Sequence, residues 1–167
     1  MKYQIAYINV YGNAKVLANE IMNILPEDNV EEIDLSYQEI TDDADVYLIG
    51  FEITSAAIPL KIMDVLEKLD GKTIICFATH SLTGFESKES IEKKFLPFLP
   101  AECDYRGLFC CLGQIPVNVL ASIEEITQEH PDRTQAAEAL ESCRKSMDHP
   151  DIEDIRSLRL FIQKSGI

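Results

Sequence analysis

The sequence predicts a three-layer α/β fold, in which helices cover both faces of a doubly wound, five-stranded parallel sheet of strand order 2-1-3-4-5. Short, continuously apolar runs alternate along the chain with segments of helical spacing. The apolar runs lack the alternation of a half-exposed strand, which indicates parallel strands buried on both faces. No linker or internal repeat divides the 167 residues, so we expect a single domain over residues 1–167.

The first strand and helix are joined by a turn with the properties of an anion site. The apolar run Tyr3–Ile8 is followed by a polar turn and then by the helical spacing of residues 17–25. Such a turn leaves the first N–H groups of the helix without partners, and the helix dipole favours an anion there. Gly12 lies where the backbone would approach a bound phosphate.

The remaining elements follow from the same periodicity. The other expected strands are Val30–Ile33, Val46–Ile49 with Gly50 at its end, Thr73–Phe77 and Tyr105–Cys111. Helical stripes run through Ile58–Leu69, Ile91–Leu99, Val119–Ile126, Ala136–Met147 and Ile155–Ile162. Right-handed crossovers place helices on both faces of the sheet. The topological switch then lies between the first and third strands, and a ligand is expected at their carboxyl ends.

The composition restricts the partners. A formal net charge of −14 argues against nucleic acid and against an anionic membrane surface, because both require basic patches. A basic protein is the natural complement of such a chain. The sequence has no apolar run near the ~20 residues of a membrane span and no cationic, apolar signal segment, which predicts a cytoplasmic protein.

Four short motifs occur near the ends of the predicted elements: YGN at 11–13, GF at 50–51, GLFCCLGQIP at 107–116 and HPDIEDI at 149–155. With these motifs the chain resembles the flavodoxin family over nearly its whole length. It is most similar to a branch of flavodoxin-like proteins from anaerobic bacteria with an extended helical C-terminus. Flavodoxin with FMN at the switch point is the standard example of this strand order. The resemblance implies an FMN-binding electron carrier that serves a basic redox partner protein.

The resemblance also implies where FMN would lie. In flavodoxins, hydroxyl side chains of the first loop help to hold the phosphate; here Asn9, Tyr11 and Ala14 stand at those positions, and the backbone donors remain. The second loop of the branch usually has an aromatic residue after Gly-Phe to stack on the flavin, and here Glu52 takes that place. The residues expected at the cofactor are Asn9, Val10, Tyr11, Gly12, Asn13, Ala14, Phe51, Glu52, Ile53, Thr79, His80 and Phe85.

Three of these residues have alternative interpretations. Phe51 either stacks on the flavin or belongs to the core at the end of its strand. Glu52 either lies beside the ring, where it would lower the flavin potential, or is a solvated loop charge. His80 either contacts the ligand or is a surface histidine of the third loop.

Three functions from different classes remain open. The first is an FMN-binding electron carrier, and the second is a flavodoxin-fold interaction or regulatory protein that no longer binds FMN. The third is an enzyme in which Glu52, His80 and Cys110 or Cys111 converge at one sheet edge as acid, base and thiol. The five cysteines have no CxxC or Cys/His metal spacing, so we expect reduced, buried thiols. Of the three functions we prefer the FMN-binding electron carrier, with the interaction or regulatory protein as the alternative.

Overall fold

The structure is a computed structural model that describes residues 1–54, 57–81 and 87–167. Within these residues a five-stranded parallel sheet has the order β2-β1-β3-β4-β5, which confirms the predicted fold class. The strands are β1 (Tyr3–Tyr7), β2 (Val30–Asp34), β3 (Val46–Ile53), β4 (Thr73–His80) and β5 (Asp104–Leu112). Strand β2 is at the edge of the sheet, as the predicted strand order requires.

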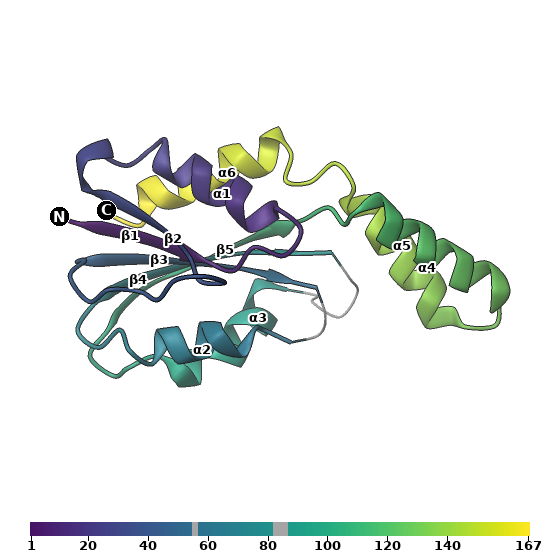
Figure 1. The fold of residues 1–167 in the computed structure, drawn as a ribbon, viewed down its shortest axis with the longest axis horizontal. Helices are drawn as coiled ribbons and strands as arrows, with labels where there is room; N and C mark the ends of the chain where they lie inside the picture. The colour runs from purple at the N-terminus through teal and green to yellow at the C-terminus, as the bar shows by residue number, and fades with distance from the viewer. Residues whose placement is uncertain (55–56, 82–86) are drawn as a thin grey trace.

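Four helices cover the sheet and two do not. Figure 1 shows α1 (Asn13–Met22) and α6 (Ile152–Lys164) on one face of the sheet, with α2 (Leu60–Leu66) and α3 (Lys88–Phe95) on the other. Short 3₁₀ turns, η1 (Glu27–Asn29) and η2 (Leu96–Phe98), follow α1 and α3. Two separate clusters of buried side chains lie on the two faces.

Helices α4 (Val117–Glu129) and α5 (Thr134–Ser146) pack on each other and project from the sheet as a hairpin (Figure 1). None of the residues of α4 is buried. This pair therefore covers neither face of the sheet. The reason is that the apolar stripes of α4 and α5 are satisfied largely by each other.

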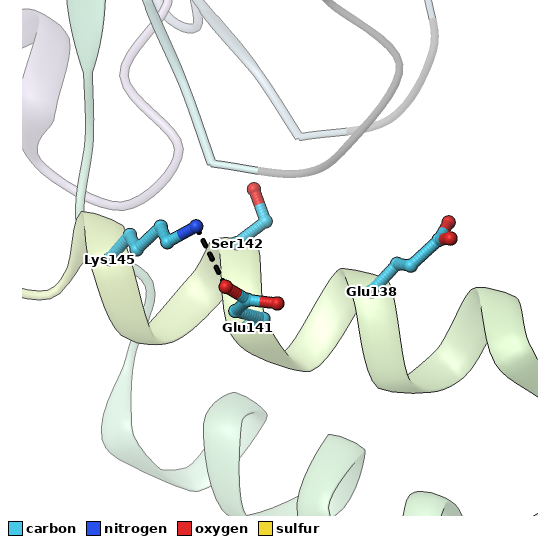
Figure 2. Close-up of a pocket in the computed structure, with 4 residues that line it drawn as sticks. All are labelled: Glu138, Glu141, Ser142 and Lys145. Atoms are coloured by element: carbon cyan, nitrogen blue, oxygen red, sulfur yellow. Dashed lines mark ion pairs between the residues drawn. The ribbon is translucent and has the colours of Figure 1, made fainter.

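The hairpin also carries two surface hollows. One, of about 550 Å³, is lined by residues 133–136 at the start of α5. The other, of about 250 Å³, is lined by Glu138, Glu141, Ser142 and Lys145 (Figure 2). The Lys145 ammonium forms an ion pair with the Glu141 carboxylate at 2.8 Å across this hollow. Both hollows lie on the hairpin rather than at the carboxyl ends of β1 and β3.

Strands β3 and β4 extend three residues beyond the predicted ends. They remain paired from Phe51↔Ala78 to Ile53↔His80, past the last residue of β1. Because the two strands support each other there, Glu52 and His80 are strand residues and not loop residues as predicted. No helix in the described part of the chain has the length and apolarity of a membrane span.

Candidate functional site

The turn between β1 and α1 is the predicted anion site. Helix α1 begins at Asn13, and Gly12 before it has φ +101°, a conformation that favours glycine. The Asn9 side-chain oxygen accepts a hydrogen bond from the Lys15 N–H at 3.2 Å, which satisfies one donor of the first helical turn. We call residues 9–14 the nest.

The nest holds an anion that belongs to the protein itself. The carboxylate of Glu52 accepts backbone N–H hydrogen bonds from four nest residues. Its Oε1 accepts from Val10 at 3.0 Å, Gly12 at 3.2 Å and Ala14 at 3.2 Å. Its Oε2 accepts from the Tyr11 N–H at 2.9 Å and from the Asn13 side-chain amide at 3.1 Å. Only 2% of Glu52 is exposed.

The pleat of β3 explains how Glu52 reaches the nest. Side chains of a strand alternate between its faces. Val46 and Leu48 belong to the core on the α1 side, so Glu52 points to that side as well. Because β1 ends at Tyr7, which pairs with Gly50, residue 52 lies beyond β1 and directly beneath the turn that follows it.

The electrostatics of α1 favour this arrangement. The first turn of the helix contains no acidic residue, and Gly12 provides no side-chain cap. Glu52, which belongs to β3, therefore provides the negative charge at the positive end of the helix dipole and accepts hydrogen bonds from N–H groups that have no partner within the helix. Both carboxylate oxygens of Glu52 accept hydrogen bonds from N–H donors of this turn.

Asn13 connects the nest to the root of the hairpin. Its side-chain amide donates to Glu52 and also to the Gln114 carbonyl oxygen at 2.9 Å, and its Oδ1 accepts from the Gln114 N–H at 3.1 Å. The same Gln114 N–H donates to the His149 carbonyl oxygen at 2.8 Å. A Cβ at Gly113 would lie 2.9 Å from the Asn13 side chain, so the chain can pass this close only at a glycine.

The other residues predicted at the cofactor lie in different surroundings. Thr79 is buried beside Glu52, with which it pairs in register. Phe51 and Ile53 belong to the core on the opposite face, where Phe51 packs edge to face on Phe95 with ring centroids 6.2 Å apart. His80 ends β4 half-buried, and burial lowers its pKa. Phe85 lies outside the described residues.

Glu52 is the functional feature that sequence reasoning placed incorrectly. The residue is not a solvated loop charge, because it is buried in a strand and bonded to the nest. The sequence shows only a single carboxylate between the apolar residues Phe51 and Ile53. The face of the sheet to which it points is fixed by the pairing of β3 with β4 through Ile53.

The acid, base and thiol of the enzyme alternative do not converge. Glu52 faces α1, whereas the alternation of β4 turns His80 toward the face of α2 and α3. Burial raises the pKa of Cys110 to about 12 and also raises that of Cys111. Thiols of this kind are poor nucleophiles at neutral pH. All five cysteines are free, as expected, but only Cys76, Cys111 and Cys143 are buried, whereas Cys103 and Cys110 are half-buried.

Comparison with known proteins agrees with this fold. The family model for the flavodoxin domain matches residues 4–163. The chain is 25% identical over 172 residues to the flavodoxin-like domain-containing protein BilS of Clostridioides difficile strain CD3, a match that covers 100% of this chain and 97% of that protein.

Solved flavodoxins have the same architecture. The flavodoxin of Streptococcus pneumonia TIGR4 superposes with a TM-score of 0.61 at 15% identity, covering 99% of this chain and 97% of that one. The oxidised flavodoxin 2 of Bacillus cereus superposes with a TM-score of 0.58 at 18% identity, covering 98% and 99%. From the family match across nearly all of its length, the chain belongs to the flavodoxin-domain family.

Proposed function

We propose that this protein is a flavodoxin-fold interaction or regulatory protein that does not hold FMN by its phosphate. The observation that supports this proposal is the carboxylate of Glu52 in the nest, bonded to four backbone N–H groups and to Asn13. Members of the family generally bind flavin, so FMN is the cofactor against which the site must be tested.

The residues of the nest do not fit a flavin phosphate in this arrangement. The N–H groups that would bind the phosphate already donate to Glu52. A phosphate beside the carboxylate would also meet a like charge. Two unit charges 4 Å apart at an effective dielectric constant of 20 repel by about 4 kcal/mol, or about three decades in affinity. FMN could enter only after the side chain of Glu52 left the nest.

An FMN-binding electron carrier is the second candidate. Its support is the convergence of backbone N–H groups on an anion at the family's phosphate position. In that function the flavin would supply the electron chemistry, and the nest would hold its phosphate. Phe51, the aromatic residue considered for stacking, has no exposed surface to offer a ring.

A protein partner is the natural target of either function. The net charge of −14 favours association with a basic surface, through faster encounter and through complementarity. The projecting hairpin offers apolar side chains beside this charge, because Val117 is 72% exposed and Ile126 is 46% exposed. The partner we propose is therefore a basic protein.

The experiment that separates the two candidates is the absorbance spectrum of the purified protein mixed with FMN. The proposal predicts a spectrum equal to the sum of protein and free FMN, and no flavin in the protein fraction after desalting. A shifted flavin band that survives desalting would overturn the proposal and support the electron carrier.

A further inference from the structure

We propose that Glu52 is an internal substitute for a bound phosphate, holding the nest in its ligand-bound form with the protein's own carboxylate. The inference rests on the proposed function, because it assigns to Glu52 the place that a cofactor phosphate would otherwise take. It adds a role for this residue, which is to order the turn, the start of α1 and the root of the hairpin.

The hydrogen bonds from the nest saturate the carboxylate of Glu52. A carboxylate offers about four lone-pair sites, and the five N–H hydrogen bonds to Glu52 use all of them. The backbone donors of Val10, Tyr11, Gly12 and Ala14 are correspondingly occupied. The nest has no free donor among these for a second oxyanion while Glu52 remains in place.

Carboxylates and phosphates bind such a nest in the same way. Both are oxyanions that accept charge-assisted hydrogen bonds from backbone N–H groups and gain from the positive end of a helix dipole. Burial strengthens these interactions, and Glu52 is almost completely buried. The carboxylate therefore does for the turn what a bound phosphate does in an open nest.

A hydrogen-bond network connects the nest to the root of the hairpin. Glu52 orients the Asn13 amide, and Asn13 holds both polar groups of the Gln114 backbone. Gln114 in turn bonds the His149 carbonyl oxygen, so the two chain segments at the root of the hairpin meet at this residue. Glu52 thereby positions structure far beyond the turn that it touches directly.

The test uses two variants and inorganic phosphate. Glu52→Ala removes the anion and leaves space, whereas Glu52→Gln removes the charge but keeps the side-chain volume in the nest. Both variants should melt roughly 5–10 °C below the wild type, because N–H groups lose charge-assisted hydrogen bonds. Phosphate should then raise the melting temperature of Glu52→Ala with increasing concentration.

Three controls separate binding from general salt effects. The wild type and Glu52→Gln should gain no more from millimolar phosphate than from chloride at equal ionic strength, since phosphate also stabilises proteins non-specifically. Glu92→Gln makes the same change in charge on α3, across the sheet, where Glu92 accepts a hydrogen bond from the Tyr105 hydroxyl at 2.7 Å. This variant should show no phosphate-specific gain.

Calorimetry with phosphate gives the direct readout. We expect phosphate to bind Glu52→Ala at least tenfold more tightly than the wild type. Equal binding by the two proteins, or no phosphate-specific rise in the melting temperature of Glu52→Ala, would overturn the inference. A failure of the proposed function can be distinguished from a failure of this inference, because the proposed function fails only if the wild type retains FMN after desalting.

The Gln114 amide reports on the network. In the two-dimensional ¹⁵N–¹H spectrum, Glu52→Ala should shift the Gln114 signal and speed its hydrogen exchange, and added phosphate should reverse both changes. A Gln114 signal unaffected by the substitution would show that the nest does not position the hairpin root.

Discussion

Asn13 and Gln114, which are 101 positions apart in the chain, exchange two hydrogen bonds. The Asn13 side-chain amide donates to the Gln114 carbonyl oxygen at 2.9 Å, and the Gln114 N–H donates to the Asn13 Oδ1 at 3.1 Å. Asn13 is only 2% exposed. The Asn13 side chain thus pairs with both backbone polar groups of Gln114, in the segment that follows β5. Its amide also donates a hydrogen bond to Glu52.

Asn13→Ala should destabilise the protein by about 2–4 kcal/mol, because it removes the three hydrogen bonds that the buried Asn13 side chain makes to Glu52 and Gln114. Asn13→Asp should cost at least as much, since its carboxylate cannot donate to Glu52 and brings a like charge beside it. Urea unfolding of both variants tests this. Wild-type stability in either variant would show that the two hydrogen bonds do not hold the segment.

Gly12→Ala should cost about 1–2 kcal/mol through the positive φ of residue 12, since its Cβ would meet no atom within 4 Å. Gly71→Ala is a matched control, because Gly71 also has a positive φ and open space around its Cβ. In the Glu52→Ala background only Gly12→Ala should also weaken phosphate binding, measured by calorimetry. Equal phosphate affinity in both double variants would remove residue 12 from the anion site.

The cysteines should be unreactive in the folded protein. With a pKa of about 12, Cys110 is a thiolate in only about 10⁻⁴ of molecules at pH 8. Ellman's reagent should therefore react only slowly with the folded protein. In denaturant it should react with all five thiols. Because the pKa is raised, reactivity should increase as the pH rises toward it. A single thiol that reacts rapidly with Ellman's reagent at neutral pH, and whose reaction disappears in Cys110→Ser or Cys111→Ser, would support the enzyme alternative.

The chain should behave as one domain despite its projecting hairpin. Leu158 and Ile162 of α6 are buried, and Arg159 forms an ion pair with Glu20 of α1. Trypsin should cut after the exposed Arg133 between α4 and α5, and the two pieces should still elute together in size-exclusion chromatography. Release of a stably folded fragment that ends near residue 113 would contradict the single domain.

The sheet could be predicted from the sequence because its signals are local. Buried parallel strands give continuous apolar runs, such as residues 46–49, and Gly50 lies where β3 passes the Phe77 ring. The nest could be located for the same reason, since a strand, a turn with a glycine and a helix follow one another in residues 3–22.

The occupant of the nest could not be predicted in this way. Taking Gly50 as the end of β3 made Glu52 a loop residue, and the face of a loop side chain has no periodic signal. Only the pairing of β3 with β4 through Ile53 fixes the side to which Glu52 points. The hairpin was missed for a similar reason, because the apolar stripe of α4 does not reveal whether a sheet or another helix will cover it.

The most direct test of the account is a high-resolution crystal structure of the wild type grown with phosphate and FMN in the solution. The account predicts the Glu52 carboxylate in the nest, bonded to the N–H groups of Val10, Tyr11, Gly12 and Ala14, with no phosphate beside it. A phosphate group on those four N–H groups, with Glu52 turned away toward solvent, would contradict the account.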